Sequence, residues 1–168
     1  MYAKILVLVD GSSTSDAGLS EAIRLARMSG GRIRLMHFVD EIPYIPEVSR
    51  FGATVPDLTG PARERGRALL ERSRALVARA GVDVDTVMRE GIGAHLVEFV
   101  IDEVDAWRAE VVVLGTHGRR GLGRLLIGSD AEEVVRKSRV PVLLVHQDEG
   151  HGTSEALPSA RTAEGTAA

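Results

Sequence analysis

The chain has 168 residues, of which 44% are hydrophobic and 4% aromatic, and this suits one domain with an aliphatic core. The net charge of −3 gives no general attraction for nucleic acid, and the absence of cysteine excludes disulfides, thiolate metal sites and a cysteine nucleophile. Because no apolar run approaches the ~20 residues that span a bilayer and the first residues lack a signal-peptide pattern, we expect a soluble cytoplasmic protein without a membrane partner.

The first third of the chain predicts two strands, a helix and a long loop. Residues 5–9 form an unbroken apolar run that ends at Asp10, which is typical of a strand buried on both faces of a parallel sheet. Residues 13–29 repeat apolar side chains at helical spacing and end at a glycine pair, and residues 33–39 predict a second strand. Residues 41–60 contain three prolines without a clear period, so we expect a long surface loop or lid there.

The middle of the chain predicts an arginine-rich helix and a third strand. Residues 61–80 place apolar side chains, among them Leu69 and Leu76, in one inward stripe, while their arginines alternate with glutamates as on a solvated surface. Residues 82–89 alternate in the manner of a strand with one more exposed face. After Gly93 the apolar spacing becomes helical again, so a further helix is expected.

The last third completes the alternation of strand and helix. Residues 111–114 predict a fourth buried strand, a short helix around Val134 follows a glycine-rich loop, and residues 140–145 predict a fifth strand. This order predicts one α/β sandwich domain, residues 1–147, with a parallel sheet and right-handed crossovers. Residues 148–168 are polar and rich in small side chains, and we expect them to form a disordered tail.

The loop before the last helix is the strongest functional feature of the sequence. Gly115 follows the fourth strand, Gly118 and Gly128 lie within the loop, and Ser129 opens the helix. Glycines let backbone N–H groups approach a phosphate closely, and the first turn of a helix offers further unpaired N–H donors. Arg119 and its neighbouring arginines add positive charge for phosphate oxygens. The loop therefore predicts an anion-binding site that suits phosphate.

This loop matches neither of two common phosphate-binding motifs. Gly123 and Gly128 have the spacing of a Walker A loop, but Ser129 occupies the lysine position, and the dinucleotide fingerprint G-x-G-x-x-G is absent. A purely structural interpretation stays open, because Ser129 and Glu132 have the pattern of a capping box that starts a helix. His117 lies on the loop, but the nucleophile-elbow pattern is absent and we assign no catalytic residue.

Three stretches of the chain resemble the universal stress protein family in its ATP-binding subgroup. The spacing Gly-x2-Gly-x9-Gly-Ser of residues 115–129 is similar to that family's ATP-binding signature. Residues 5–12, which read Ile-Leu-Val-Leu-Val-Asp-Gly-Ser, resemble its opening strand, and residues 139–145 resemble its closing strand. The resemblance covers residues 3–146.

The resemblance implies both a fold and a ligand. The fold is a Rossmann-like, three-layer α/β sandwich of the adenine nucleotide alpha hydrolase type, with a five-stranded parallel sheet in the order 3-2-1-4-5. The ligand is ATP or another adenine nucleotide, bound between the ends of strands one and four, with Mg2+ possible beside it. The implied nucleotide-binding residues are Leu8, Val9, Asp10, Phe38, Val39, Leu114, Gly115, Gly118, Arg119, Gly128, Ser129 and Asp130.

Within that set the resemblance assigns different parts of the nucleotide to different residues. Leu8 and Phe38 flank the adenine, whereas Asp10 lies beside the ribose and triphosphate and is the implied metal ligand. Its position at the end of a strand supports a ligand role independently. Asp130 departs from the family, which usually has a small or apolar residue there. Its carboxylate favours the helix dipole but repels a triphosphate unless a metal ion bridges the two.

The resemblance further implies a homodimer, whose interface we expect on residues 140–145, an apolar strand at a sheet edge. The favoured function is an ATP-binding protein that acts in stress response or signalling through nucleotide-dependent conformation or partner choice. Two alternatives stay open. One is a slow ATPase or self-phosphorylating enzyme that uses Ser129, Ser12 or a nearby threonine, and the other is a nucleotide-free interaction module in which Asp130 abolishes binding. The ATP-binding function without fast turnover is favoured over both, because the loop has no accompanying base, catalytic lysine or acceptor-substrate site.

Overall fold

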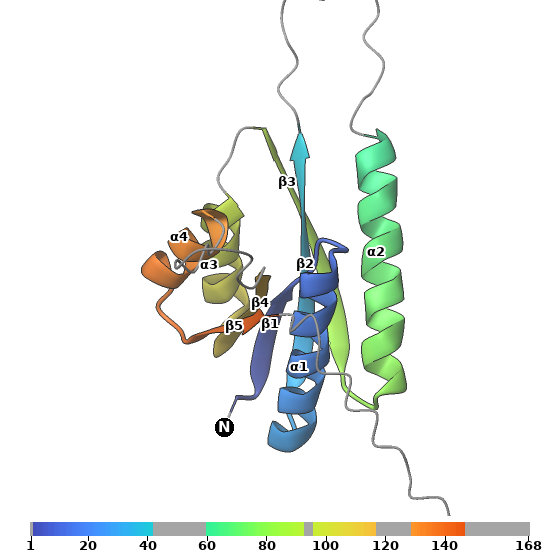
Figure 1. The fold of residues 1–168 in the computed structure, drawn as a ribbon, viewed down its shortest axis with the longest axis vertical. Coiled ribbons are helices and arrows are strands. Elements are labelled where there is room, and N and C mark those ends of the chain that lie inside the picture. Colours follow the sequence, from blue (N-terminus) through green and yellow to red (C-terminus); the bar gives the residue numbers. More distant parts are fainter. Residues whose placement is uncertain (1, 42–59, 93–95, 117–128, 147–168) are drawn as a thin grey trace, which may run out of the picture.

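The structure is a computed structural model that describes residues 2–41, 60–92, 96–116 and 129–146. Strands and helices alternate along the chain, as the sequence predicted (Figure 1). Their bounds are β1 Lys4–Leu8, α1 Ser13–Ser29, β2 Arg32–Glu41, α2 Gly60–Arg79, β3 Val84–Ile92, α3 Leu96–Trp107, β4 Val111–Thr116, α4 Ser129–Lys137 and β5 Val142–His146. In the described ranges, no helix is long and apolar enough to cross a membrane.

The strands form one parallel sheet in the order β3-β2-β1-β4-β5. β1 is the central strand, since Ile5 pairs with Ile33 of β2 on one side and with Val111 of β4 on the other. The chain builds the sheet outward from β1 to β3, then crosses back to add β4 and β5 on the other side. The predicted α/β class and the strand order 3-2-1-4-5 are confirmed.

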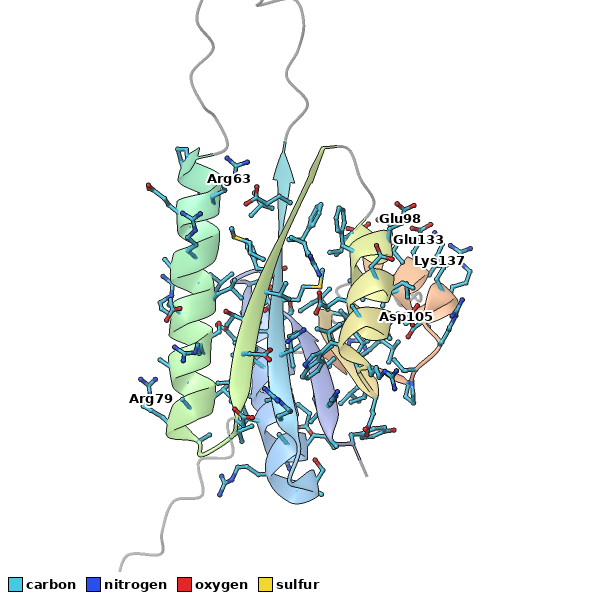
Figure 2. All side chains as sticks on the ribbon, turned by 180° about the vertical axis from the view of Figure 1, so that it is seen from behind. Arg63, Arg79, Glu98, Asp105, Glu133 and Lys137 are labelled. Atoms are coloured by element: carbon cyan, nitrogen blue, oxygen red, sulfur yellow. The ribbon has the colours of Figure 1, made fainter. Side chains whose placement is uncertain are left out.

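Helices cover both faces of the sheet. α1 and α2 lie over one face, and α3 and α4 lie over the other (Figures 1 and 2). In β1, Ile5 and Val7 pack beneath α1 and α2, whereas Leu6 packs beneath α3 and α4. All three side chains are fully buried. This two-sided burial explains why the first strand reads as an unbroken apolar run.

Local sequence sets both ends of α1. Ser12 caps the start, because its Oγ accepts a hydrogen bond from the Ser15 N–H at 3.1 Å. A cap of this kind contributes about 1 kcal/mol to helix stability. Gly30 ends the helix in the left-handed region, at φ 66°, and donates its N–H to the Ala26 carbonyl. The cap also fixes the short turn between β1 and α1, at the end of the sheet where the site lies.

Two predictions about α2 and β3 were wrong. β3 covers Val84–Ile92, not residues 82–89, because the Val82 N–H still donates to the Val77 carbonyl and belongs to the end of α2. Leu76 was expected in the inward stripe of α2, but its side chain is 46% exposed. It lies at the margin of the buried stripe, so the helix presents a large apolar side chain to solvent.

The structure also corrects the bounds of the long loop and of the last strand. β2 extends through Glu41 and α2 begins at Gly60, which shortens the predicted loop 41–60 at both ends. β5 covers Val142–His146, not residues 140–145, because the Val140 N–H bonds the Ser138 Oγ in the turn before the strand. The rest of the predicted lid and the predicted tail 148–168 lie outside the described residues.

Candidate functional site

A cavity of about 490 Å³ opens at the carboxyl ends of β1, β2 and β4. The first turns of α1 and α4 and the beginning of α3 complete its walls. Its lining residues are Leu8, Val9, Asp10, Thr14, Ser15, Met36, His37, Phe38, Leu96, Leu114, Gly115, Thr116, Asp130, Ala131 and Val134. Small-molecule sites in proteins typically have volumes of about 300–1,000 Å³.

The strand order explains why the cavity lies at this place. The helix that follows β1 covers one face of the sheet, and the helix that follows β4 covers the other. Neighbouring strands whose helices leave toward opposite faces create a crevice beyond their carboxyl ends. Asp10 after β1 and Gly115 in β4 both line this crevice, as the sequence predicted.

Part of the cavity lining is apolar. Met36 and Leu114 are buried there, and Leu8 and Phe38 are half-buried nearer the opening. The Phe38 ring packs against Phe99 of α3 at a centroid distance of 5.2 Å in a tilted pair. An aromatic surface supported by a second ring suits a planar heteroaromatic group such as a nucleobase.

Polar side chains also line the cavity, and two of them are carboxylates. Asp10 is exposed, its Oδ1 accepts the Ser12 N–H at 2.8 Å, and its own N–H donates to the Ser15 Oγ at 3.2 Å. These bonds hold Asp10 at the rim of the cavity. Asp130 is exposed in the first turn of α4. Both side chains can bind a hydroxyl group or a hard divalent cation.

His37 lies in the wall of the cavity, a role that no sequence pattern indicated. Its Nδ1 lies 2.8 Å from the Val9 carbonyl oxygen, which can only accept, so Nδ1 carries a proton. On its other side the ring lies against Gly66 of α2, where a Cβ would come within 2.6 Å of the ring Cδ2. Gly66 therefore lets α2 pack against the imidazole, which closes this wall.

Gly115 is required for the close approach of β4 to α1. A Cβ at this position would lie 2.0 Å from the Thr14 carbonyl oxygen and 2.6 Å from the Ser15 nitrogen, both backbone atoms. No L-amino acid other than glycine can occupy such a place without moving one of the two elements. The sequence predicted Gly115 as a phosphate-loop residue, and the structure adds this packing role in the cavity wall.

An ion network around the buried Glu103 fixes α3 to the sheet, and α3 supplies Leu96 to the cavity lining and Phe99 behind Phe38. Glu103 is 1% exposed, and its two oxygens accept from Arg34 of β2 at 2.7 Å and Arg89 of β3 at 2.5 Å. Arg34 also binds Asp85 through two nitrogens, at 2.6 and 2.9 Å. These contacts, the Asp85 hydrogen bond foremost, raise the pKa of the Arg34 guanidinium above its ordinary value.

Comparison with known proteins places the chain in a family. A sequence profile of the universal stress protein family matches residues 1–146. The chain belongs to the universal stress protein family. A curated relative, the universal stress protein MJ0531 of Methanocaldococcus jannaschii, is 30% identical over 86% of this chain and 82% of its own length. The solved structure of the hypothetical protein MJ0577 is 26% identical, with a TM-score of 0.70 over 89% of this chain and 99% of that one.

Several solved structures of this fold contain adenine nucleotides. A universal stress protein from Archaeoglobus fulgidus was solved in complex with dAMP; it is 20% identical, with a TM-score of 0.60 over 86% of this chain and 98% of that one. An Arabidopsis thaliana family protein was solved with AMP bound, at 19% identity and a TM-score of 0.64 over 88% and 93% of the two chains. Another universal stress protein was solved with cAMP, at 22% identity and a TM-score of 0.59 over 86% and 97%. At these identities the likeness establishes the shared fold.

The structure brings together seven of the residues that the universal stress protein resemblance implied. The cavity is lined by Leu8, Val9, Asp10, Phe38, Leu114, Gly115 and Asp130. Val39 lies instead in a neighbouring cleft, and Ser129 is exposed at the start of α4, 3.5 Å from Asp130 through their side-chain oxygens. Gly118, Arg119 and Gly128 lie outside the described residues.

The sequence did not single out the remaining cavity residues. These are Thr14, Ser15, Met36, His37, Leu96, Thr116, Ala131 and Val134. Met36, His37 and Thr116 follow from strand register, because parallel strands end at the same edge and bring Met36 level with Leu8. The other five lie on α1, α3 and α4, and their place depends on how these helices pack on the sheet. Within the described ranges, no three His, Asp or Glu side chains converge as a metal site.

Proposed function

We propose that this family member binds an adenine nucleotide in the cavity between the ends of β1 and β4. The observation that carries the proposal is that one cavity combines apolar lining, with Phe38 backed by Phe99, and exposed polar groups such as Asp10. Such a combination suits a base against the apolar residues and a ribose with phosphates near the polar groups. Relatives of the same fold solved with AMP, dAMP and cAMP support adenine as the base.

We further propose ATP with Mg2+ as the preferred ligand. Asp10 and Asp130 both line the cavity, and no lysine or arginine does so among the residues that the structure describes. Carboxylate oxygens are the ligands that Mg2+ takes together with substrate phosphates. A bridging cation would relieve the repulsion between these carboxylates and a polyphosphate, with Asp10 as its protein ligand.

The bound nucleotide is proposed to act as a signal and not as a substrate. The protein would serve in stress response or signalling, and nucleotide occupancy would select a conformation or a partner, since a ligand shifts an equilibrium toward the state that it binds better. Ser12 is one of the residues predicted to accept a phosphate in the enzyme alternative. Its Oγ already accepts a hydrogen bond that caps α1.

Calorimetric titration with ATP and MgCl2 tests the nucleotide proposal. We expect saturable binding of ATP to the wild-type protein. The affinity of Phe38→Ala is expected to be lower by about tenfold or more, because the alanine removes the aromatic surface for the base. Urea unfolding of the same variant separates loss of binding from loss of fold. Absence of binding to the wild type at millimolar ATP would remove nucleotide binding from the proposal.

Asp130→Asn is expected to raise the affinity for ATP measured without divalent ions, by about three- to tenfold. The change removes one negative charge that lines the cavity, and a charge at a solvated rim is worth on the order of 1 kcal/mol. Glu132→Gln is the matched control, because Glu132 is also exposed in the first turn of α4 but does not line the cavity. Equal gains in both variants would show a general charge effect and contradict a specific role for Asp130.

We also propose a homodimer through the predicted strand 140–145, which the structure places at β5, Val142–His146. β5 is an edge strand whose four apolar residues are only half-buried. The other edge, β3, carries Asp85, Arg89 and Glu90, and charges on an edge discourage pairing. Sedimentation equilibrium is expected to give twice the 18.0 kDa mass of the chain. A monomer at micromolar concentration would contradict the dimer.

A further inference from the structure

A second cleft, of about 530 Å³, lies beside the cavity on the α2 face of the sheet. Its lining residues are Asp10, Gly11, His37, Phe38, Val39, Ala62, Arg65, Gly66, Ala68, Leu69 and Arg72. Asp10, His37 and Phe38 also line the cavity proposed for the nucleotide, so the two hollows share a wall. The remaining lining residues come mainly from α2, which makes this cleft a distinct surface.

Two arginines of α2 line this cleft without an anionic partner in the described part of the chain. Arg65 and Arg72 are exposed, and neither forms an ion pair or side-chain hydrogen bond with any residue that the structure describes. On the other side of α2, Arg63 binds Glu90 at 2.6 Å and Arg74 lies 3.7 Å from Glu71, whereas Arg67 has no such contact with a described residue. The cleft side of α2 therefore presents two arginines that form no ion pair with a described residue, and Asp10 is the acidic residue in the same lining.

The positive charge continues along α2 beyond the cleft. Arg79 follows Arg72 at the same seven-residue spacing that separates Arg65 from Arg72, and positions seven apart lie nearly on one face of a helix. Figure 2 shows Arg79 at the end of α2, pointing away from the sheet. Leu76, which is 46% exposed, lies on the same face between Arg72 and Arg79. We call Arg65, Arg72, Leu76 and Arg79 the arginine stripe.

The length of the arginine stripe indicates the kind of ligand. At a rise of 1.5 Å per residue the three arginines are about 10 Å apart and cover about 21 Å along the helix. A single phosphate or carboxylate would meet one guanidinium only. An extended polypeptide advances about 3.1–3.3 Å per residue, so acidic side chains at every third position recur at about the same interval.

We propose that the arginine stripe and the second cleft form a docking site for an extended acidic segment of a partner protein. Carboxylates of the segment pair with the three arginines, its aliphatic portions contact Leu76 and the apolar floor at Leu69, and the segment ends near the shared wall. α2 has six arginines and two glutamates in a chain of net charge −3, so the attraction is local to this helix.

The observations favour a polypeptide over a nucleic acid. Phosphates along a nucleic acid strand are closer together than the arginines of the stripe, and single-stranded binders add aromatic side chains on which the bases stack. The stripe instead carries an exposed leucine. Docking goes beyond the proposed nucleotide binding and needs no nucleotide, so either proposal can fail without the other.

Fluorescence anisotropy with a labelled (Glu-Pro-Pro)4 peptide tests the docking site in the full chain without nucleotide. The peptide is expected to bind at low salt, and the affinity is expected to fall about tenfold in the double variant Arg65→Gln/Arg72→Gln. The matched control is Arg67→Gln/Arg74→Gln, which removes the same charge from the other side of α2 and is expected to change the affinity less than about twofold. Circular dichroism of both variants confirms that α2 remains folded.

Three results would overturn the docking site. The first is absence of peptide binding at millimolar concentration. The second is an equal loss of affinity in the two double variants, which would indicate general electrostatic attraction. The third is tighter binding of a single-stranded oligonucleotide of equal charge with the same dependence on Arg65 and Arg72, which would assign the stripe to nucleic acid. Weaker binding of (Gln-Pro-Pro)4 would support the carboxylate contacts.

Discussion

Glu103→Ala is expected to lower the free energy of unfolding by about 2–4 kcal/mol, because it removes two charge-assisted hydrogen bonds of a buried carboxylate and takes away the acidic partner of Arg89. Glu103 is 1% exposed and accepts from both Arg34 and Arg89. After the change Arg34 keeps Asp85 and stays over the Trp107 ring of α3, 4.7 Å from its centroid, but it loses its hydrogen bond to Glu103. α3 then loses its polar attachment to β2 and β3.

Urea unfolding followed by circular dichroism measures this effect. Glu98→Ala is the matched control, since Glu98 is exposed on the same helix (Figure 2) and its loss is expected to cost less than about 0.5 kcal/mol. Glu103→Gln keeps the shape and part of the hydrogen bonding, so an intermediate loss is expected. A loss below about 1 kcal/mol in Glu103→Ala would show that the network contributes little to the fold.

The fold could be predicted from the sequence because its signals are local. The unbroken apolar run of β1 indicates two-sided burial, and the glycine after α1 marks its end. The boundaries that were wrong depend on the hydrogen bonds of single residues, as for Val82, whose N–H still belongs to the end of α2. The exposure of Leu76 depends on how α2 lies against the sheet, which helical periodicity leaves open within about one residue.

The site could be predicted only in part, because much of it depends on contacts between distant parts of the chain. Asp10 and Phe38 follow from the carboxyl ends of strands and from the family resemblance. His37 lies in the cavity wall through its bond to the Val9 carbonyl, 28 residues away. Glu103 reads as an ordinary helix glutamate until β2 and β3 supply Arg34 and Arg89. Such pairs have no sequence pattern of their own.

Gly115→Ala is expected to weaken both the fold and nucleotide binding. The new Cβ would lie 2.0 Å from the Thr14 carbonyl oxygen, and this oxygen belongs to the backbone of α1, so no side-chain rotation can relieve the contact. β4 and α1 must separate, which is expected to lower the free energy of unfolding by about 1–3 kcal/mol or more. Thr14, Ser15 and Gly115 all line the cavity, so the same displacement widens the proposed nucleotide site.

Gly81→Ala separates the effect on the site from a general loss of stability. Gly81 has φ 76°, and a Cβ added there would meet no heavy atom within 4 Å beyond its chain neighbours, so alanine costs about 1–2 kcal/mol of backbone strain and leaves the cavity unchanged. Calorimetric titration with ATP and Mg2+ is expected to show at least a tenfold loss of affinity for Gly115→Ala and less than a twofold change for Gly81→Ala. If both variants kept the wild-type affinity, the separation of β4 and α1 would not change nucleotide binding. The nucleotide would then have to lie away from the contact between these two elements.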